Sequence, residues 1–187
     1  MFVGHFGLAA AVKTAQPRVP LWSLMLATQF LDVVFVVLYL AGGIESFHAV
    51  APGTYGEALI DAQYTHSLLG ALLLSALYGG IAAWRWGRKA GWVLGAMVFS
   101  HWLLDLLVHR ADLPLLPGNA GGLSLLGLGL WQVPWATAVV EGVLLVVGAV
   151  LYFRSVRERA AITGRAMVAG GVMALLLVLS LAVDVLS

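Results

Sequence analysis

The stretch Gly91–Val108, with the sequence GWVLGAMVFSHWLLDLLV, places His101 and Asp105 inside an otherwise apolar run. A helix that crosses a bilayer needs about 20 predominantly apolar residues, and several other parts of this chain have the same character. Of the 187 residues, 61% are hydrophobic and 10% are charged, whereas soluble domains average about 45–50% and about 25%. This composition excludes both a water-soluble globular protein and an extended disordered chain. Cysteine is absent, which excludes disulfides and thiolate metal sites.

The apolar runs are continuous rather than alternating, which predicts helices and not a transmembrane barrel. We expect an all-α, polytopic transmembrane helical bundle of about six helices, with residues 1–187 forming a single integral membrane domain. The first helix, Phe2–Val12, is short and carries His5; no basic residue precedes it, so it is not typical of a signal peptide. The other five predicted spans and their ionisable residues are Pro20–Gly42 with Asp32, Tyr64–Trp84 with His66, Gly91–Val108 with His101 and Asp105, Trp131–Phe153 with Glu141, and Ala166–Leu186 with Asp184.

The basic residues predict the orientation of these spans. Nine of the ten lysines and arginines fall near residues 13–18, 85–89 and 154–165, and only Arg110 falls on the opposite side. Basic loops stay on the cytoplasmic side, so we expect both termini outside. Residues 43–63 are expected to form an irregular loop, and residues 110–130 a re-entrant or interfacial hairpin. The net charge of +1 gives no argument for a nucleic-acid partner.

Ionisable side chains in a membrane are costly, and they pair with one another or mark a functional site. Counting 1.5 Å per residue along each helix, we expect those in the first five helices to meet between the midplane and the outer surface. The spacing of His101, Asp105 and His109 puts them on one helical face. Imidazole and carboxylate together suit zinc or a similar divalent ion. The candidate ligands are His5, Asp32, His66, His101, Asp105 and His109, enough for one or two ions with Asp105 as a bridge; the alternative is a plain hydrogen-bonded His101–Asp105 pair without metal.

Several short motifs follow one another in a recognisable order: Gly4–His5, Asp32, Tyr64-Thr65-His66-Ser67, Ser100-His101-x-x-x-Asp105, and Leu113-Pro114-Leu115-Leu116-Pro117. In this order the chain resembles the bacterial membrane-bound metal-dependent hydrolases over roughly residues 1–120, and it is remotely similar to zinc-dependent phospholipase C-type enzymes. The family often has a second acid two residues after the first, where this chain has Val34. The resemblance implies a multi-pass protein of the bacterial inner membrane and a metal-dependent hydrolase.

We therefore predict a divalent metal cofactor, with zinc as first choice, in a hydrolase that acts on a lipid or lipid-linked ester or phosphoester. Glu141 is the candidate general base, and the expected partners are membrane lipid and a lipid-like substrate. One alternative is a proton- or metal-coupled transporter that uses the same buried residues. A haem protein is a weaker alternative, because His66 and His101 are expected to differ by about 10 Å in depth. A catalytically silent partner protein that keeps the fold and the metal is a further alternative.

Overall fold

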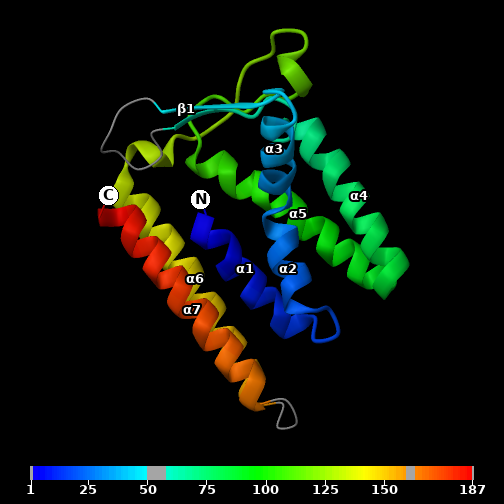
Figure 1. Ribbon diagram of the computed structural model, residues 1–187, viewed down its shortest axis with the longest axis vertical. Coiled ribbons are helices and arrows are strands. Elements are labelled where there is room, and N and C mark those ends of the chain that lie inside the picture. Colours follow the sequence, from blue (N-terminus) through cyan, green and yellow to red (C-terminus); the bar gives the residue numbers. More distant parts are fainter. Residues whose placement is uncertain (1, 50–57, 159–162, 187) are drawn as a thin grey trace.

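The computed structural model describes residues 2–49, 58–158 and 163–186, and this part of the chain is an α-helical bundle, as predicted (Figure 1). Its seven α-helices are α1 (Phe2–Ala15), α2 (Leu21–Thr28), α3 (Phe30–Leu40), α4 (Leu68–Trp86), α5 (Arg88–Val108), α6 (Pro134–Arg157) and α7 (Thr163–Leu186). The predicted span Pro20–Gly42 is divided between α2 and α3, which meet at a bend of 59°. Helices α4, α5 and α6 are each long and apolar enough to cross a membrane, and α2 with α3 makes a fourth span if the bent pair is counted as one.

Helices α4 and α5 form an antiparallel pair that contributes much of the buried core. Ser67 caps the start of α4, because its hydroxyl accepts a hydrogen bond from the backbone N–H of Gly70 at 2.9 Å. The connection between the two helices is the single residue Gly87, whose φ of +89° favours glycine. Close packing continues along the pair, where a methyl group on Gly95 would lie 3.0 Å from the backbone oxygen of Ser75.

Helix α1 lies beside α6 and α7, with its N-terminus well inside the bundle (Figure 1). A Cβ atom on Gly148 of α6 would overlap the backbone oxygen of Gly7, so the two helices approach at a pair of glycines. Small residues at such a crossing allow backbones to pack closely. Val3 is buried completely against Leu145 of α6 and Leu177 of α7, and Ala9 is buried completely in the core shared with α2 and α5, so α1 is a packed helix of the bundle.

Two non-helical segments cover the end of the bundle at which α5 finishes (Figure 1). Strands β1 (Ser46–Ala49) and β2 (Ala58–Asp61) pair antiparallel, with Ser46 opposite Asp61. The expectation of a wholly irregular loop over residues 43–63 is therefore wrong, because backbone pairing orders its two ends. Residues 110–130 form a hairpin, closed by backbone hydrogen bonds of 3.0 and 2.7 Å between Leu113 and Leu126.

That hairpin also completes the start of α4. The first N–H groups of a helix have no partner within the helix. The N–H groups of Leu68 and Leu69 donate to the backbone oxygens of Pro114 and Leu115 at 3.0 and 3.1 Å. The hairpin therefore fixes where α4 begins, and with it the turn just before the helix, which carries His66.

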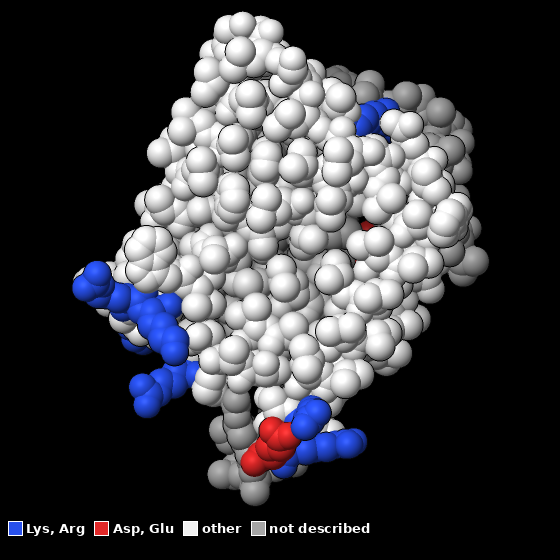
Figure 2. All heavy atoms as spheres, turned by 180° about the vertical axis from the view of Figure 1, so that it is seen from behind, with Lys and Arg blue, Asp and Glu red and all other residues white. Residues whose placement is uncertain are grey.

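The outer surface of the bundle is largely apolar, as a bilayer requires. Figure 2 shows a broad face almost free of Lys, Arg, Asp and Glu, with basic side chains gathered mainly at its lower end. Leu73 on α4 is 62% exposed and Val146 on α6 is 60% exposed. The basic residues thus lie mostly at the end opposite the hairpin and the β-ribbon.

Candidate metal centre

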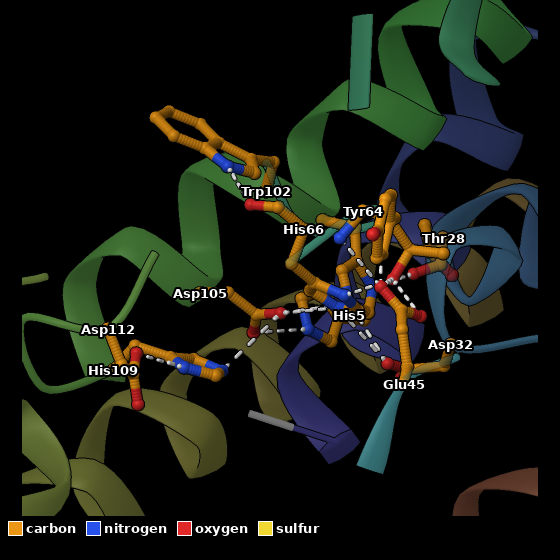
Figure 3. Close-up of polar contacts among 12 residues, drawn as sticks. His5, Thr28, Asp32, Glu45, Tyr64, His66, Trp102, Asp105, His109 and Asp112 are labelled. Carbon is orange, nitrogen blue, oxygen red and sulfur yellow. Dashed lines mark hydrogen bonds and ion pairs between the residues drawn. The ribbon is translucent and has the colours of Figure 1, made fainter. Parts of the chain in front are cut away.

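Five ionisable side chains from four parts of the chain converge inside the bundle (Figure 3). We call them the His/Asp cluster: His5 of α1, Asp32 of α3, His66 of the turn before α4, and His101 and Asp105 of α5. All are at least 97% buried except Asp32, whose side chain is 44% exposed. The sequence places His66 inside a helix that starts at Tyr64; in the structure it precedes α4, which begins at Leu68.

The side chains of the cluster are within contact distance of one another. Asp105 Oδ2 lies 2.9 Å from His101 Nε2 and 3.6 Å from His66 Nε2, and Asp105 Oδ1 lies 3.3 Å from His5 Nε2. Asp32 Oδ1 lies 3.4 Å from Nε2 of both His66 and His101. The group contains two sets that could each hold a metal ion, His5–His101–Asp105 and Asp32–His66–His101, which share His101.

The hydrogen bond made by Nδ1 of His101 determines whether Nε2 of the same ring carries a hydrogen or a lone pair. Its Nδ1 lies 2.6 Å from the backbone oxygen of Thr28, and because a carbonyl oxygen only accepts, Nδ1 carries the hydrogen. A neutral imidazole has one N–H, so Nε2 presents a lone pair. That lone pair faces a carboxylate oxygen of Asp105 at 2.9 Å, so two acceptors meet with no hydrogen between them. The contact therefore requires either a second proton on His101 or a cation held between these groups.

His5 completes this side of the cluster from α1. Its ring stacks on that of His101, with centroids 4.1 Å apart and planes 9° from parallel. Its Nδ1 is buried and makes no hydrogen bond within the described part of the chain. Buried polar atoms nearly always have a partner, so this nitrogen is exceptional; the nitrogen of His5 that faces Asp105 is Nε2.

The stacking also bears on the haem alternative. Nε2 of His66 lies 3.3 Å from Nε2 of His101, so the expected separation of about 10 Å in depth, counted at 1.5 Å per residue, is wrong. The side chain of His66 reaches back into the bundle from the turn before α4. With His5 stacked on one of the two rings and the nitrogens in contact, a flat macrocycle has no space between them.

His109 lies next to the cluster but belongs to neither ligand set. Its Nε2 is 4.0 Å from Asp105 Oδ2, while its Nδ1 is 2.9 Å from Asp112 Oδ1. Its ring also packs on Trp131 at 4.3 Å. Asp105 thus lies between His101 and His109, the arrangement expected of a bridge, and a ligand role for His109 stays a prediction.

Glu141, the candidate general base, is fully buried on α6. Its Oε2 accepts hydrogen bonds from the backbone N–H groups of Val3 and Gly4 at 2.7 and 3.1 Å. Its carboxylate therefore binds the start of the helix that carries His5. A catalytic role stays a prediction, and the structure assigns this oxygen a role in holding α1.

Sequence reasoning missed three residues that support the cluster. Trp102 donates its Nε1–H to the backbone oxygen of His66 at 2.8 Å. Thr65 Oγ1 lies 2.8 Å from His66 Nδ1, and Glu45 is in turn bonded to Thr65. In the sequence, Glu45 resembles an ordinary acidic residue of a surface loop. The one signal that could have singled it out is its position three residues after the predicted apolar span Pro20–Gly42.

Neither a family model, nor a curated protein, nor a solved structure matches this chain. The chemistry of the cluster is therefore the basis for assigning a function. Its imidazole nitrogens and carboxylate oxygens are the donor types that bind zinc and other borderline divalent ions, and the buried His/Asp groups could hold such an ion.

Proposed function

We propose that the protein is a membrane metalloenzyme whose His/Asp cluster binds a divalent cation, with zinc as first choice. The contact between His101 Nε2 and Asp105 Oδ2 carries this proposal. Two lone pairs at hydrogen-bond distance repel each other unless positive charge lies between them, and a divalent cation supplies that charge. The remaining donors complete two ligand sets that share His101, one with His5 and Asp105 and the other with Asp32 and His66.

The outer partners of the histidines support metal binding over a plain hydrogen-bonded pair. A histidine that binds a metal almost always donates its other ring N–H to a carbonyl or carboxylate oxygen. His101 does so to Thr28, and the Nδ1 of His109 lies at hydrogen-bond distance from Asp112. In both residues Nε2 faces Asp105.

We infer that the bound cation serves hydrolysis of an ester or phosphoester. A structural zinc site is closed, whereas a catalytic site keeps one position accessible. Asp32 gives the cluster such a side, because its carboxylate is partly exposed while the other members are buried. When bound, a divalent ion polarises an ester or phosphoryl oxygen and lowers the pKa of an adjacent water molecule. Asp32, the partly exposed carboxylate of the cluster, would be the group that accepts a proton from such a water molecule.

The surroundings of the cluster favour a substrate with an apolar tail. The site lies among helices whose outer faces are apolar, and we infer that a lipid or lipid-linked molecule would approach it from the bilayer. The clustering of basic side chains at the opposite end supports a cytoplasmic location for that end. The proposed site then opens toward the outer half of a bacterial inner membrane.

The first experiment measures metal content and hydrolysis together. Wild-type protein purified in detergent should contain one or two zinc ions per chain by elemental analysis, and Asp105→Asn should contain markedly fewer. Asp61→Asn removes an exposed carboxylate outside the cluster and is the matched control. A panel of phospholipids should be hydrolysed by wild type and by the control alone. Equal metal content in wild type and Asp105→Asn would contradict the proposal.

The alternative is a proton-coupled transporter. A protonated His101 would also explain its 2.9 Å contact with Asp105, and buried His and Asp residues are the groups that such carriers use. Protein without bound metal that moves protons in proteoliposomes and leaves the lipid intact would favour this function over hydrolysis.

A further inference from the structure

Glu45 is a buried carboxylate that lies between α3 and β1, close to the His/Asp cluster but outside it (Figure 3). Only 1% of its surface is exposed. Its Oε1 accepts hydrogen bonds from the backbone N–H groups of Tyr64 and Thr65, both at 2.8 Å. Both of its oxygens contact Thr65 Oγ1, at 3.1 and 2.9 Å. Glu45 therefore binds the turn that leads into His66.

The direction of these hydrogen bonds follows from what each group can donate. An ionised carboxylate only accepts, and a hydroxyl has one hydrogen and two lone pairs. The single hydrogen of Thr65 Oγ1 therefore points to Glu45. Its lone pairs remain for His66, whose Nδ1 lies 2.8 Å away. Thr65 accepts there, so Nδ1 of His66 carries the hydrogen.

This assignment leaves Nε2 of His66 with a lone pair. That nitrogen lies 3.4 Å from Asp32 Oδ1 and 3.3 Å from His101 Nε2, so it faces the centre of the cluster. His66 thus has the same tautomer as His101, whose Nδ1 donates to Thr28. Two unprotonated nitrogens then point at one place, which is the arrangement that a shared cation requires.

We propose that Glu45 is a positioning residue that acts through Thr65 to hold His66 in the tautomer and orientation in which it binds the metal. This inference rests on the proposed metal site and extends it to two residues that do not touch the cation. Groups that orient metal-binding histidines typically contribute about 10–100-fold in metal affinity, and that is the effect we expect from Glu45.

The substitution Glu45→Gln tests the direction of the hydrogen bonds with little change in shape. The glutamine oxygen can still accept from the N–H groups of Tyr64 and Thr65, in the place of Oε1. Its amide N–H then faces Thr65 Oγ1 in the place of Oε2 and donates to it. The hydroxyl hydrogen must turn to His66 Nδ1, which forces the ring hydrogen onto Nε2 and removes the metal-binding lone pair.

The substitution Thr65→Val separates this mechanism from a simple structural role. Without the hydroxyl, His66 takes either tautomer, whatever residue 45 carries. We expect Glu45→Gln to weaken zinc binding by about 10–100-fold in the wild-type background and to have no further effect in Thr65→Val. Thr65→Ser keeps the hydroxyl and should bind like wild type. Glu158→Gln, at an exposed position, is the matched control.

Two measurements are needed, one with metal and one without. Zinc affinity is obtained by competition with a chelating dye. The His66 tautomer is read from imidazole ¹⁵N chemical shifts of metal-free protein, with the signal assigned by its loss in His66→Gln. We expect Nδ1–H in wild type and Nε2–H in Glu45→Gln.

The outcomes distinguish the positioning role from the metal site itself. An unchanged tautomer in Glu45→Gln, or an equal loss of affinity with and without the Thr65 hydroxyl, would overturn the role of Glu45. A tautomer that switches as expected in protein that binds no zinc would support the role of Glu45 and would overturn the proposed function alone.

Discussion

Replacing Glu141 tests whether this carboxylate holds α1 or takes part in catalysis. Its Oε2 receives the N–H groups of Val3 and Gly4 at 2.7 and 3.1 Å, in a fully buried position. Those N–H groups belong to the first turn of α1, where a helix has no internal acceptors for them. Glu141→Ala removes the acceptor, whereas Glu141→Gln keeps an oxygen in place and removes only the charge.

The size of each effect follows from these contacts. A buried N–H group left without a partner costs about 1–3 kcal/mol, so two of them should lower the free energy of unfolding in Glu141→Ala by about 2–6 kcal/mol. The charge of Glu141 at the helix N-terminus contributes up to about 2 kcal/mol in a buried setting. Glu141→Gln should therefore be destabilised by no more than that amount.

Unfolding in mixed detergent micelles, followed by helical circular dichroism, measures both variants against wild type. Hydrolysis at saturating zinc adds the second readout. If Glu141 were the general base, Glu141→Gln would hydrolyse the substrate about 10²–10⁴-fold more slowly than wild type. A residue that only holds α1 leaves turnover close to wild type. Stability of Glu141→Ala within about 0.5 kcal/mol of wild type, which is ordinary for surface changes, would refute the reasoning from the two N–H groups.

Three further predictions concern the metal and the packing around it. Zinc at 100 times its dissociation constant should stabilise the protein by about 2.7 kcal/mol, so a chelator should lower Tm; an unchanged Tm would contradict a folded-state metal site. Gly148→Ala puts a methyl group against the backbone of Gly7. It should lower the free energy of unfolding by about 1–3 kcal/mol and weaken zinc binding, because α1 carries His5. Gly80→Ala, whose methyl group meets no atom within 4 Å, is the control, and equal stability of the two variants would argue against the close crossing. His109→Gln should leave at least one zinc ion bound by elemental analysis, because neither ligand set includes that residue; complete loss of zinc would place it among the principal ligands.

The helical spans could be predicted because hydropathy is a local property of the sequence. The apolar runs correspond to α4, α5 and α6 with shifts of a few residues at their ends. The bend at Gln29 between α2 and α3 could not be predicted in this way. Most residues on both sides of it are apolar and compatible with a helix, and neither proline nor glycine marks the break. The change of direction accompanies a change of neighbours, because α2 packs against α1 and α5 whereas α3 packs against α4 and α5.

The convergence of the His/Asp cluster could be predicted for a related reason. Ionisable side chains inside a membrane are costly, and those of neighbouring spans reduce this cost by pairing at the same depth. Counting residues along each span gives that depth. The count failed for His66, because it assumed a helix from Tyr64. The hairpin carbonyls of Pro114 and Leu115 complete the first turn of α4 at Leu68, and this long-range contact has no signal in the sequence near His66.

Two other buried carboxylates, Glu45 and Glu141, show why position in a span is a poor guide to a role. Glu141 lies in a predicted span and looks catalytic, whereas Glu45 lies in a predicted loop and looks solvated. In the folded chain each accepts hydrogen bonds from two backbone N–H groups. The donors to Glu45 lie 19 and 20 residues away in the sequence, and those to Glu141 lie 138 and 137 residues away. Backbone donors satisfy these two acids, since a carboxylate is stable in a buried site when N–H groups point at it.

The contact between His101 and Asp105 differs in this respect. The imidazole hydrogen of His101 is already given to Thr28, so the fold supplies no hydrogen for the 2.9 Å contact with Asp105. An added proton or a metal ion has to supply the positive charge, and of the two only the metal ion also uses the lone pair of His66 Nε2, which lies 3.3 Å from His101 Nε2. Metal content is therefore the direct test of whether the site holds an ion, and the tautomer of His66, which Glu45 is proposed to set through Thr65, tests whether one of its ligands is prepared for that ion.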